Sequence, residues 1–383
     1  MKPTLEVADI FRMHGPAYRA HFADRMPLQH KRAMRAIEIC RTSALGGHTD
    51  QCDTCGKQRI SYNSCRNRHC PKCQFLKTER WIEARTEDLL PIPYFHVVFT
   101  LPEELRPVAR ANQRVVYDLL FKAASETLIE LAADGKYLGA KIGLIAVLHT
   151  WSQTLIHHPH VHCIVTGGGL AKDGAWRASR ADYLLPVRVL SRLYRGKLLA
   201  KLRSAEKAGD LKASLAPETI RELYTKEWTV YAKRPFAGAE HVVAYLGRYT
   251  HRIAISNHRM IDHDGESVRF RYRDSVQGDR HRVMRLDAQE FIRRFLLHVL
   301  PHGFVKIRHY GLLGNRCRQA DLRVCRQRLL GIWEKSRPGE PKTWEEILLQ
   351  VVGIDIRMCP DCGGHMVRVE GLAPERAPPT ATC

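Results

Sequence analysis

The chain has 383 residues, of which 61 are Lys or Arg and 40 are Asp or Glu, so its formal net charge is +21 at pH 7. This excess favours a polyanionic partner, nucleic acid before a membrane surface, because basic side chains release condensed counterions from phosphates. No stretch is apolar for long enough to span a bilayer, and the N-terminus lacks the apolar run of a secretory signal. We therefore expect neither a membrane protein nor a secreted one, but a protein of the cytoplasm.

A chain of this length is expected to form two or three domains. Residues 7–43 are predicted to be helical, with a break near Pro27 and a basic face that either contacts DNA or is simply solvated. A further helix is predicted over residues 75–90. The prolines at 91 and 93 then mark a domain boundary, because proline cannot continue a helix.

Twelve cysteines occur in the chain, and six of them fall between residues 40 and 73. Two CxxC pairs, Cys52 with Cys55 and Cys70 with Cys73, suit metal thiolates better than a disulfide framework. Four thiolates on two tight turns close a tetrahedral shell around Zn²⁺, so we predict a structural zinc site made by these four residues. Three nearby side chains could replace a ligand or bind a second ion: His48, Cys65 and His69.

Basic side chains surround these cysteines, Arg66 and Arg68 among them. They predict that the zinc lobe contacts DNA phosphates. A zinc site that has no contact with DNA is the alternative.

The order of the elements after residue 93 indicates the fold. Strands are predicted over residues 94–100, 139–151, 158–166 and 228–233, with helices over 102–133, 187–208 and 217–227. This β-α-β-β-α-β order predicts an α+β domain with a palm-like split βαβ unit. Its two central strands would form an antiparallel hairpin in the middle of the sheet, with one face open.

The strand over residues 158–166 contains His160 and His162, which share a face because strand side chains alternate, while Val161 and Cys163 point into the opposite layer. If the central hairpin turns near residues 154–156, His149 lies opposite His160 or His162 and shares their face. A lone strand histidine is more often a satisfied core or surface residue. Three converging imidazoles predict instead a metal site with open positions for a phosphate oxygen.

A helix over residues 239–252 would place Tyr245 and Tyr249 on one face, with Arg248 and Arg252 beside them. Tyrosines at this spacing are usually core or interface residues, but the histidines in the same domain favour a catalytic role. Water as the attacking group would make the protein a hydrolase, whereas a tyrosine hydroxyl would make it a strand transferase. A phosphotyrosine link would allow rejoining without ATP, in keeping with the lack of a P-loop motif.

Basic residues continue toward the C-terminus. Residues 266–273 and 280–286 alternate basic with apolar side chains, which predicts a two-stranded ribbon suited to a nucleic-acid backbone, and Asp287 is predicted to cap the next helix. Lys306 and Arg308 follow, and we predict that they bind DNA.

A third CxxC pair, Cys359 with Cys362, predicts half of a second zinc site, with His365 as one candidate for a further ligand. The Pro-, Ala- and Thr-rich tail after Gly371 is expected to be disordered.

Four stretches resemble, in the same order, the two-tyrosine HUH transposases of the insertion-sequence-ninety-one family: residues 65–73, 158–163, 245–252 and 304–311. Together these motifs are highly specific, whereas the HUH pair alone is not. The resemblance covers most of the chain and implies rolling-circle transposition, in which a tyrosine cuts one DNA strand, stays bound to its 5′ end and releases a 3′ hydroxyl. It also implies Mg²⁺ or Mn²⁺ at the HUH site and a zinc lobe before the nuclease domain.

By this resemblance His160 and His162 match the HUH ligands, and Tyr245 and Tyr249 match the tyrosine pair. His149 as third ligand depends on the hairpin argument and on a similar eleven-residue step in three-histidine relaxases. The sequence differs from eukaryotic rolling-circle transposases in lacking a helicase. The expected function is a DNA transposase that acts on single-stranded transposon ends and target DNA.

We expect three parts: a helical zinc-binding domain over residues 1–90, an HUH nuclease domain over 91–300, and a basic C-terminal region over 301–383. Two other functions would share many of these features. One is a nicking enzyme of the replication-initiator or relaxase type, and the other is a non-enzymatic zinc-dependent nucleic-acid-binding protein.

Overall fold

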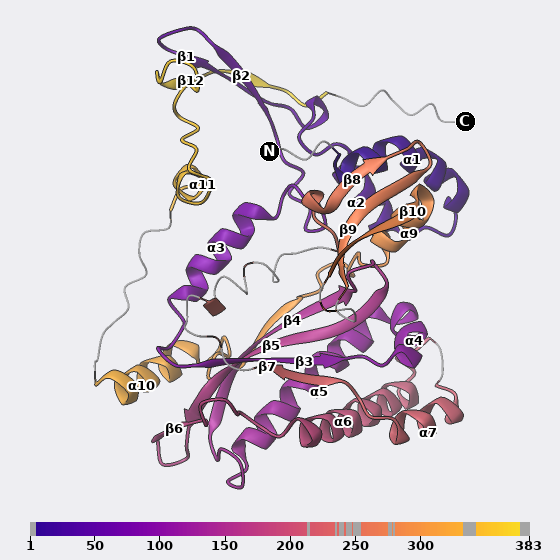
Figure 1. Cartoon of the computed structure of the whole chain (residues 1–383), viewed down its shortest axis with the longest axis vertical. Coiled ribbons are helices and arrows are strands. Elements are labelled where there is room, and N and C mark those ends of the chain that lie inside the picture. The colour runs from indigo at the N-terminus through magenta and orange to yellow at the C-terminus, as the bar shows by residue number, and fades with distance from the viewer. Residues whose placement is uncertain are drawn as a thin grey trace. The chain divides into compact units, whose positions relative to one another are not determined.

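The computed structural model describes residues 5–212, 215–233, 236, 241–242, 247, 254–274, 278, 280–331 and 342–375. The chain divides into two compact units, labelled by element in Figure 1. The sheet unit consists of Trp81–Thr250 and Leu300–Arg337, and the terminal unit of Met1–Arg80, His251–Val299 and Pro338–Cys383.

The sheet unit is built on an antiparallel sheet with the strand order β11-β4-β5-β3-β7, and β6 pairs with β5. The strands are β3 (Tyr94–Thr100), β4 (Lys141–Trp151), β5 (His157–Leu170), β6 (Trp176–Ala178), β7 (Val230–Lys233) and β11 (Ile307–Gly311). The long β4–β5 hairpin occupies the middle of the sheet. This arrangement confirms the predicted palm-like α+β fold.

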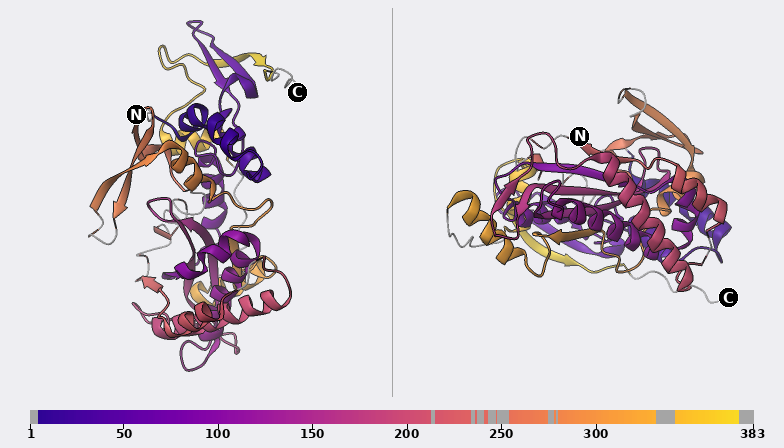
Figure 2. Two further views of the ribbon diagram at one scale, coloured as in Figure 1. Left: turned by 90° about the vertical axis from the view of Figure 1, so that its right-hand side faces the viewer. Right: turned by 90° about the horizontal axis from the view of Figure 1, so that it is seen from below.

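Helices cover one face of this sheet (Figure 1, Figure 2). Val161 and Cys163 of β5 are fully buried there, as predicted, and belong to one core with Tyr117 and Tyr194 from the helices. Each fully buried large side chain contributes roughly 1.5–3 kcal/mol, so this layer holds the hairpin rigidly. The helices are α4 (Arg106–Ala111), α5 (Gln113–Ala133), α6 (Val187–Lys207) and α7 (Pro217–Thr225), preceded by the short η2 (Glu103–Leu105).

The opposite face of the sheet is covered along part of its length by a second, smaller core. Ile145 and Val147 of β4 and Ile164 of β5 pack there with Leu322 and Cys325 of α10 (Arg318–Leu330). The next residues on this face, toward the hairpin turn, are histidines. The sheet thus has an apolar half and a histidine half on the same side.

The β11 strand approaches β4 closely at its end. Gly311 has φ +60°, and a Cβ atom at this position would lie 1.9 Å from the carbonyl oxygen of Ile142. Only glycine fits this turn without displacing the backbone.

The helical part of the terminal unit packs against a three-stranded sheet of order β10-β9-β8. Phe11 of α1 contacts Phe295 of α9, and Phe270 of β9 contacts Phe291 of α9. Asp287 accepts hydrogen bonds from the backbone N–H groups of Gln289 and Glu290, which confirms the predicted cap. The elements are α1 (Val7–Phe22), α2 (Leu28–Glu38), η1 (Ser43–Leu45), η3 (Asn257–Arg259), β8 (Met260–His263), β9 (Ser267–Asp274), β10 (Arg280–Asp287) and α9 (Ala288–Leu296).

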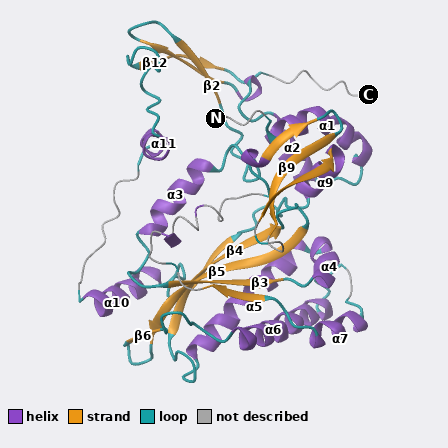
Figure 3. Cartoon of the chain, viewed as in Figure 1, coloured by secondary structure: helices purple, strands orange, loops and turns teal. Residues whose placement is uncertain are grey.

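A second three-stranded sheet of this unit joins sequence from both ends of the chain (Figure 3). Its strands are β1 (Gly47–Cys52), β2 (Gln58–Tyr62) and β12 (Met366–Leu372), and β12 pairs antiparallel with β1. Two further helices are neighbours of these strands in the sequence: α3 (Phe75–Thr86) follows β2, and α11 (Trp344–Val352) precedes β12.

The compact units differ from the domains predicted from the sequence. Residues 251–299, predicted to end the nuclease domain, belong to the terminal unit, because Phe295 of α9 packs against Phe11 of α1. Residues 300–337 return to the sheet unit through β11. The predicted tail begins within β12, and residues 376–383 lie outside the described part. No helix among the described residues combines the length and apolarity needed to cross a bilayer.

Candidate metal centres

The β4–β5 hairpin brings three histidines together. His149 is directly opposite His160, and His162 lies two residues further along the same face. One ring nitrogen from each residue lies within 4.8 Å of those of the other two. His149 is buried and the other two are half-buried. The structure therefore places the three predicted residues around one point.

Hydrogen bonds orient two of these rings. The Nδ1 atom of His160 donates to the carbonyl oxygen of His158 at 2.6 Å, and the Nδ1 atom of His162 lies 2.8 Å from Nε2 of His96. Engaging Nδ1 in this way leaves the Nε2 atom as the ligand atom, the usual arrangement of metal-binding histidines.

The environment keeps His160 and His162 neutral. Desolvation lowers the pKa of His160 to about 4. Desolvation, and then the neighbouring His149, His160 and His96, lower the pKa of His162 well below its usual value. Neutral imidazole is the form that binds a metal, so this donor set fits a divalent cation at neutral pH.

His96 is the residue that the sequence reasoning missed. It lies on β3, opposite Ile164 of β5, and its ring is parallel to that of His162 with centroids 5.1 Å apart. Burial lowers the pKa of His96 to about 3. Its position in a predicted strand was a usable signal, because pairing of that strand with β5 puts His96 on the histidine face. By contrast, His157 faces the helical layer, where its Nε2 atom lies 2.8 Å from the hydroxyl of Tyr117.

The predicted tyrosine pair is not placed relative to these histidines. Tyr245 and Tyr249 lie outside the described residues, as do Arg248 and Arg252. Their roles remain predictions from the sequence.

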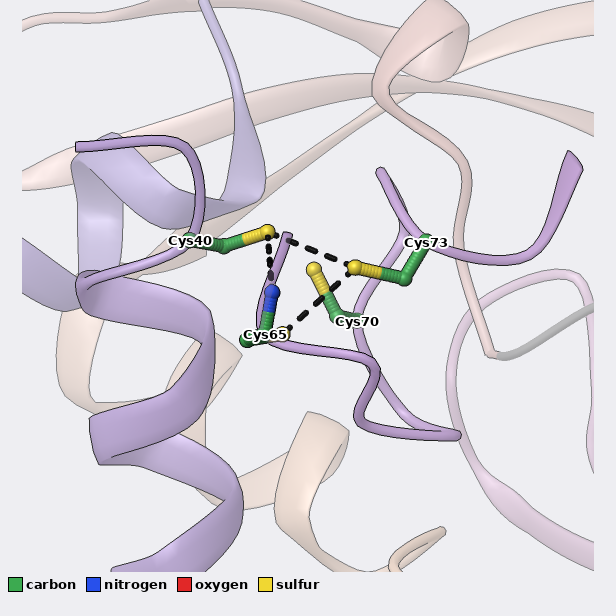
Figure 4. Close-up of side chains that lie close together, drawn as sticks. All are labelled: Cys40, Cys65, Cys70 and Cys73. Carbon is green, nitrogen blue, oxygen red and sulfur yellow. Dashed lines mark hydrogen bonds between the residues drawn. The ribbon is translucent and has the colours of Figure 1, made fainter. Parts of the chain in front are cut away.

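The first cysteine cluster is shown in Figure 4 and contains Cys40, Cys65, Cys70 and Cys73. Cys40 follows α2, and the other three come from the loop before α3. The Sγ atom of Cys73 lies 3.4 Å from that of Cys40 and 3.5 Å from that of Cys65. Thiolates 2.3 Å from a tetrahedral Zn²⁺ are about 3.8 Å apart, so the spacing fits such an ion.

The second cluster consists of Cys52, Cys55, Cys359 and Cys362. The zinc site predicted from Cys52, Cys55, Cys70 and Cys73 is therefore wrong in its membership, because the structure assigns the two pairs to different clusters. The CxxC spacing finds the pairs but cannot show which pairs meet. Cys65, one of the predicted alternatives, is a cluster member, whereas His69 bonds to Asn67 and the backbone N–H of His365 bonds to Asp53.

The predicted DNA-binding residues have different environments. Arg66 is exposed, and Arg68 is half-buried, with its pKa lowered by that burial. Arg308 forms an ion pair with Asp118, and its guanidinium lies 4.3 Å from the ring centroid of Phe121. These contacts indicate a packing role for Arg308. Lys306 is half-buried next to β11, and its carbonyl oxygen accepts from the Leu148 N–H.

Two family models match the chain. The model described as "Transposase zinc-binding domain" matches residues 10–101, and the model described as "Putative transposase" matches residues 143–320. The "Putative transposase y4qJ" of Sinorhizobium fredii (strain NBRC 101917 / NGR234) is 50% identical over 98% of this chain and 97% of its own length. The "Transposase for insertion sequence element IS801" of Pseudomonas savastanoi pv. phaseolicola is 30% identical over 87% of this chain and 82% of its own length. The chain belongs to the IS91 family of transposases.

In this IS91-family chain the transposase model spans the histidine cluster, and the zinc-binding model spans the cluster of Figure 4. Cys359 and Cys362 lie beyond both models. The family predicted from the four motifs is thus confirmed. A solved structure, the conjugative relaxase TrwC in complex with oriT DNA, is 14% identical over 40% of this chain and 69% of that one, with a TM-score of 0.23.

Proposed function

We propose that this IS91-family protein is a metal-dependent DNA strand transferase that carries out rolling-circle transposition of a single DNA strand. The observation that carries the proposal is the cluster of His149, His160 and His162 on the half-open face of the central hairpin. Three imidazoles around one point fit a divalent cation, and we expect Mg²⁺ or Mn²⁺. When bound, the cation would supply positive charge against the negative charge that develops on a phosphate during displacement.

The protein's own groups would hold this site in register. The carbonyl oxygen of His158 and the imidazole of His96 fix the rings of His160 and His162. The helical core on the other face of the hairpin restrains the backbone. A site that is held on packed strands changes little when substrate binds, which is what preorganised charge stabilisation requires.

We assign the nucleophile to Tyr245 or Tyr249. The phenolic oxygen of one tyrosine attacks the phosphorus of a phosphodiester and loses its proton, while the bond to the 3′ oxygen breaks and that oxygen takes up a proton. One phosphodiester is replaced by another, a 5′-phosphotyrosine, so attack by a 3′ hydroxyl can rejoin strands without ATP. The second tyrosine would permit a second transfer before the first link is resolved.

We propose that the partner is DNA and that the protein acts on it as a single strand. It would do so at the nucleoid in the cytoplasm. The net charge of +21 supports a polyanionic partner. The β9–β10 ribbon exposes Arg271 and Arg273 on one face, where they could contact phosphates, and Arg269 beside them pairs with Asp262.

The test is an assay for a covalent adduct. The protein is incubated with single-stranded oligonucleotides that represent the ends of its element, with Mg²⁺ or Mn²⁺, and then denatured. We expect a protein–DNA adduct that survives denaturation and is absent in Tyr245→Phe/Tyr249→Phe, while Tyr231→Phe, at an exposed tyrosine of β7, retains it. Mass spectrometry should locate the nucleotide on one of the two tyrosines. Transfer to a second oligonucleotide distinguishes a strand transferase from a simple nicking enzyme, and an adduct in the double variant would overturn the assignment.

A further inference from the structure

The second cysteine cluster joins two CxxC pairs from opposite ends of the sequence. We propose that Cys52, Cys55, Cys359 and Cys362 bind a second structural Zn²⁺, separate from the ion of the cluster in Figure 4, and that this ion fastens the C-terminal segment to the N-terminal hairpin. The pairs are more than 300 residues apart, and the zinc-binding family model includes only one of them.

The sulfur spacing fits a metal and excludes disulfides. The Sγ atoms of Cys52 and Cys362 are 3.5 Å apart, and those of Cys55 and Cys359 are 3.7 Å apart. A disulfide requires about 2.05 Å. A zinc ion with four thiolates at 2.3 Å requires about 3.8 Å between sulfurs.

The two pairs have the same backbone geometry. In each, the residue after the second cysteine is a glycine whose N–H donates to the carbonyl oxygen of the first cysteine: Gly56 to Cys52 at 3.1 Å, and Gly363 to Cys359 at 3.0 Å. Both glycines have left-handed φ values, +72° and +74°. Two equivalent tight turns that face each other present four thiolates in a near-symmetric arrangement, as closed structural zinc sites do.

Polar contacts hold the two turns against each other. The N–H of Asp53 donates to the carbonyl oxygen of His365, and the Asp53 carboxylate accepts from the His365 N–H, each at 3.0 Å. Lys57 pairs with Asp361 at 2.5 Å and brings positive charge near the thiolates. A Cβ atom on Gly364 would lie 2.4 Å from the hydroxyl of Thr54, so the two turns are packed too closely for a side chain at position 364.

The sheet that these turns close has no apolar core to stabilise it. Among the described residues of β1, β2 and β12, the buried ones are Thr49, Asp50 and Cys52. Ile60 and Val367, the apolar side chains expected to form a core, are each more than half exposed. Small units with so little buried surface need another source of stability, and structural zinc supplies folding free energy directly.

The experiment counts zinc in the full-length protein by native mass spectrometry, with elemental analysis to identify the metal. We expect Cys359→Ser/Cys362→Ser to lose one zinc per chain relative to the parent, and Cys70→Ser/Cys73→Ser to lose a different one, so that the combined variant loses two. Cys317→Ser, at an exposed cysteine outside both clusters, should lose none. A parent count that is unchanged by Cys359→Ser/Cys362→Ser, or iron in place of zinc, would overturn the proposal.

A second measurement uses the unaltered protein, in case the variants fold poorly. Iodoacetamide should label Cys317 at once but should spare Cys359 and Cys362 as long as zinc is bound. After a chelator removes the zinc, iodoacetamide should label all four cysteines of the cluster. Equal labelling of Cys362 and Cys317 in the zinc-loaded protein would contradict the proposal. Neither measurement involves DNA cleavage, so its outcome is independent of the strand-transfer chemistry.

Discussion

His149 and His160 are paired directly across the β4–β5 hairpin, with their ring centroids 5.4 Å apart. The register of the two strands therefore places His149, the proposed third ligand, next to the other two histidines. We expect His149→Ala and His160→Ala/His162→Ala each to lower adduct formation at least ~100-fold, since removing a ligand empties the site of its charge.

The matched control for these variants is His158→Ala. His158 lies on the same strand and contributes its backbone carbonyl, which the substitution keeps. It should retain adduct formation within a few fold. If His158→Ala and His160→Ala are equally inactive, the loss reflects a damaged strand.

His96 provides a test of ring positioning. We expect His96→Ala to weaken Mn²⁺ binding by about 10–100-fold, because the ring of His162 loses its hydrogen-bond partner. His96→Gln should recover part of the affinity, since its amide oxygen can accept from Nδ1. Titration with Mn²⁺ followed by electron paramagnetic resonance measures this, and equal affinity in the Ala variant and the parent would refute the role.

The pH dependence of metal binding follows from the depressed pKa values. Because desolvation lowers the pKa of His160 to about 4, protons do not compete for it between pH 8 and pH 6. Two ordinary imidazoles in place of His160 and His162, with pKa values near 6.5, would weaken binding about 17-fold at pH 6. We expect the Mn²⁺ affinity of the folded protein to change less than about fivefold over this range, as calorimetry can show.

Below this range the same shifts act on stability. The folded pKa values of His96 and His160 are depressed to about 3 and about 4, so the unfolded state binds more protons once the pH falls below about 6.5. Stability is therefore intact above pH 6.5 and is lost progressively as the pH falls toward 4.

Arg308 is expected to act through packing. Its guanidinium lies over Phe121 and pairs with Asp118. We expect Arg308→Ala to lower the free energy of unfolding by about 2 kcal/mol, from the combined loss of the ion pair and the cation–π contact. Urea denaturation measures it. A variant of normal stability that binds DNA more weakly, with the salt dependence of binding reduced by about one charge, would support the DNA-binding role instead.

Gly311 and Gly303 form a matched pair for the β11–β4 junction. Both have positive φ, but a Cβ atom at Gly311 meets the Ile142 carbonyl oxygen, whereas one at Gly303 meets nothing within 4 Å. Gly303→Ala should cost about 1 kcal/mol from backbone strain alone. Gly311→Ala should cost clearly more, as thermal unfolding can show, and equal costs would mean that β11 can shift freely.

The parts of the fold that local patterns specify were predictable. Alternation in β5 placed His160 and His162 on one face, and the hairpin placed His149 with them. The helical layer followed from the same alternation, through Val161 and Cys163. These predictions needed only the two-residue period of a strand and the pairing of neighbouring strands.

The membership of the zinc clusters was not predictable in this way. Cys40 belongs to no CxxC pair, so spacing carries no sign of its role. Cys359 meets Cys55 only because β12 pairs with β1, and nothing near either residue specifies that long-range pairing. The packing of Arg308 was not predictable for a related reason, since its partners Asp118 and Phe121 lie on α5, far earlier in the sequence.

The pairing of β12 with β1 has a consequence for synthesis of the protein. A ribosome that adds roughly 5–20 residues per second needs about 15–60 s after Cys55 emerges to deliver Cys359. During that interval the thiols of Cys52 and Cys55 lack their two partner cysteines, and the edge of β1 that pairs with β12 is unpaired. A nascent chain that stops before β12 therefore never completes this lobe, and only a chain translated through β12 presents it.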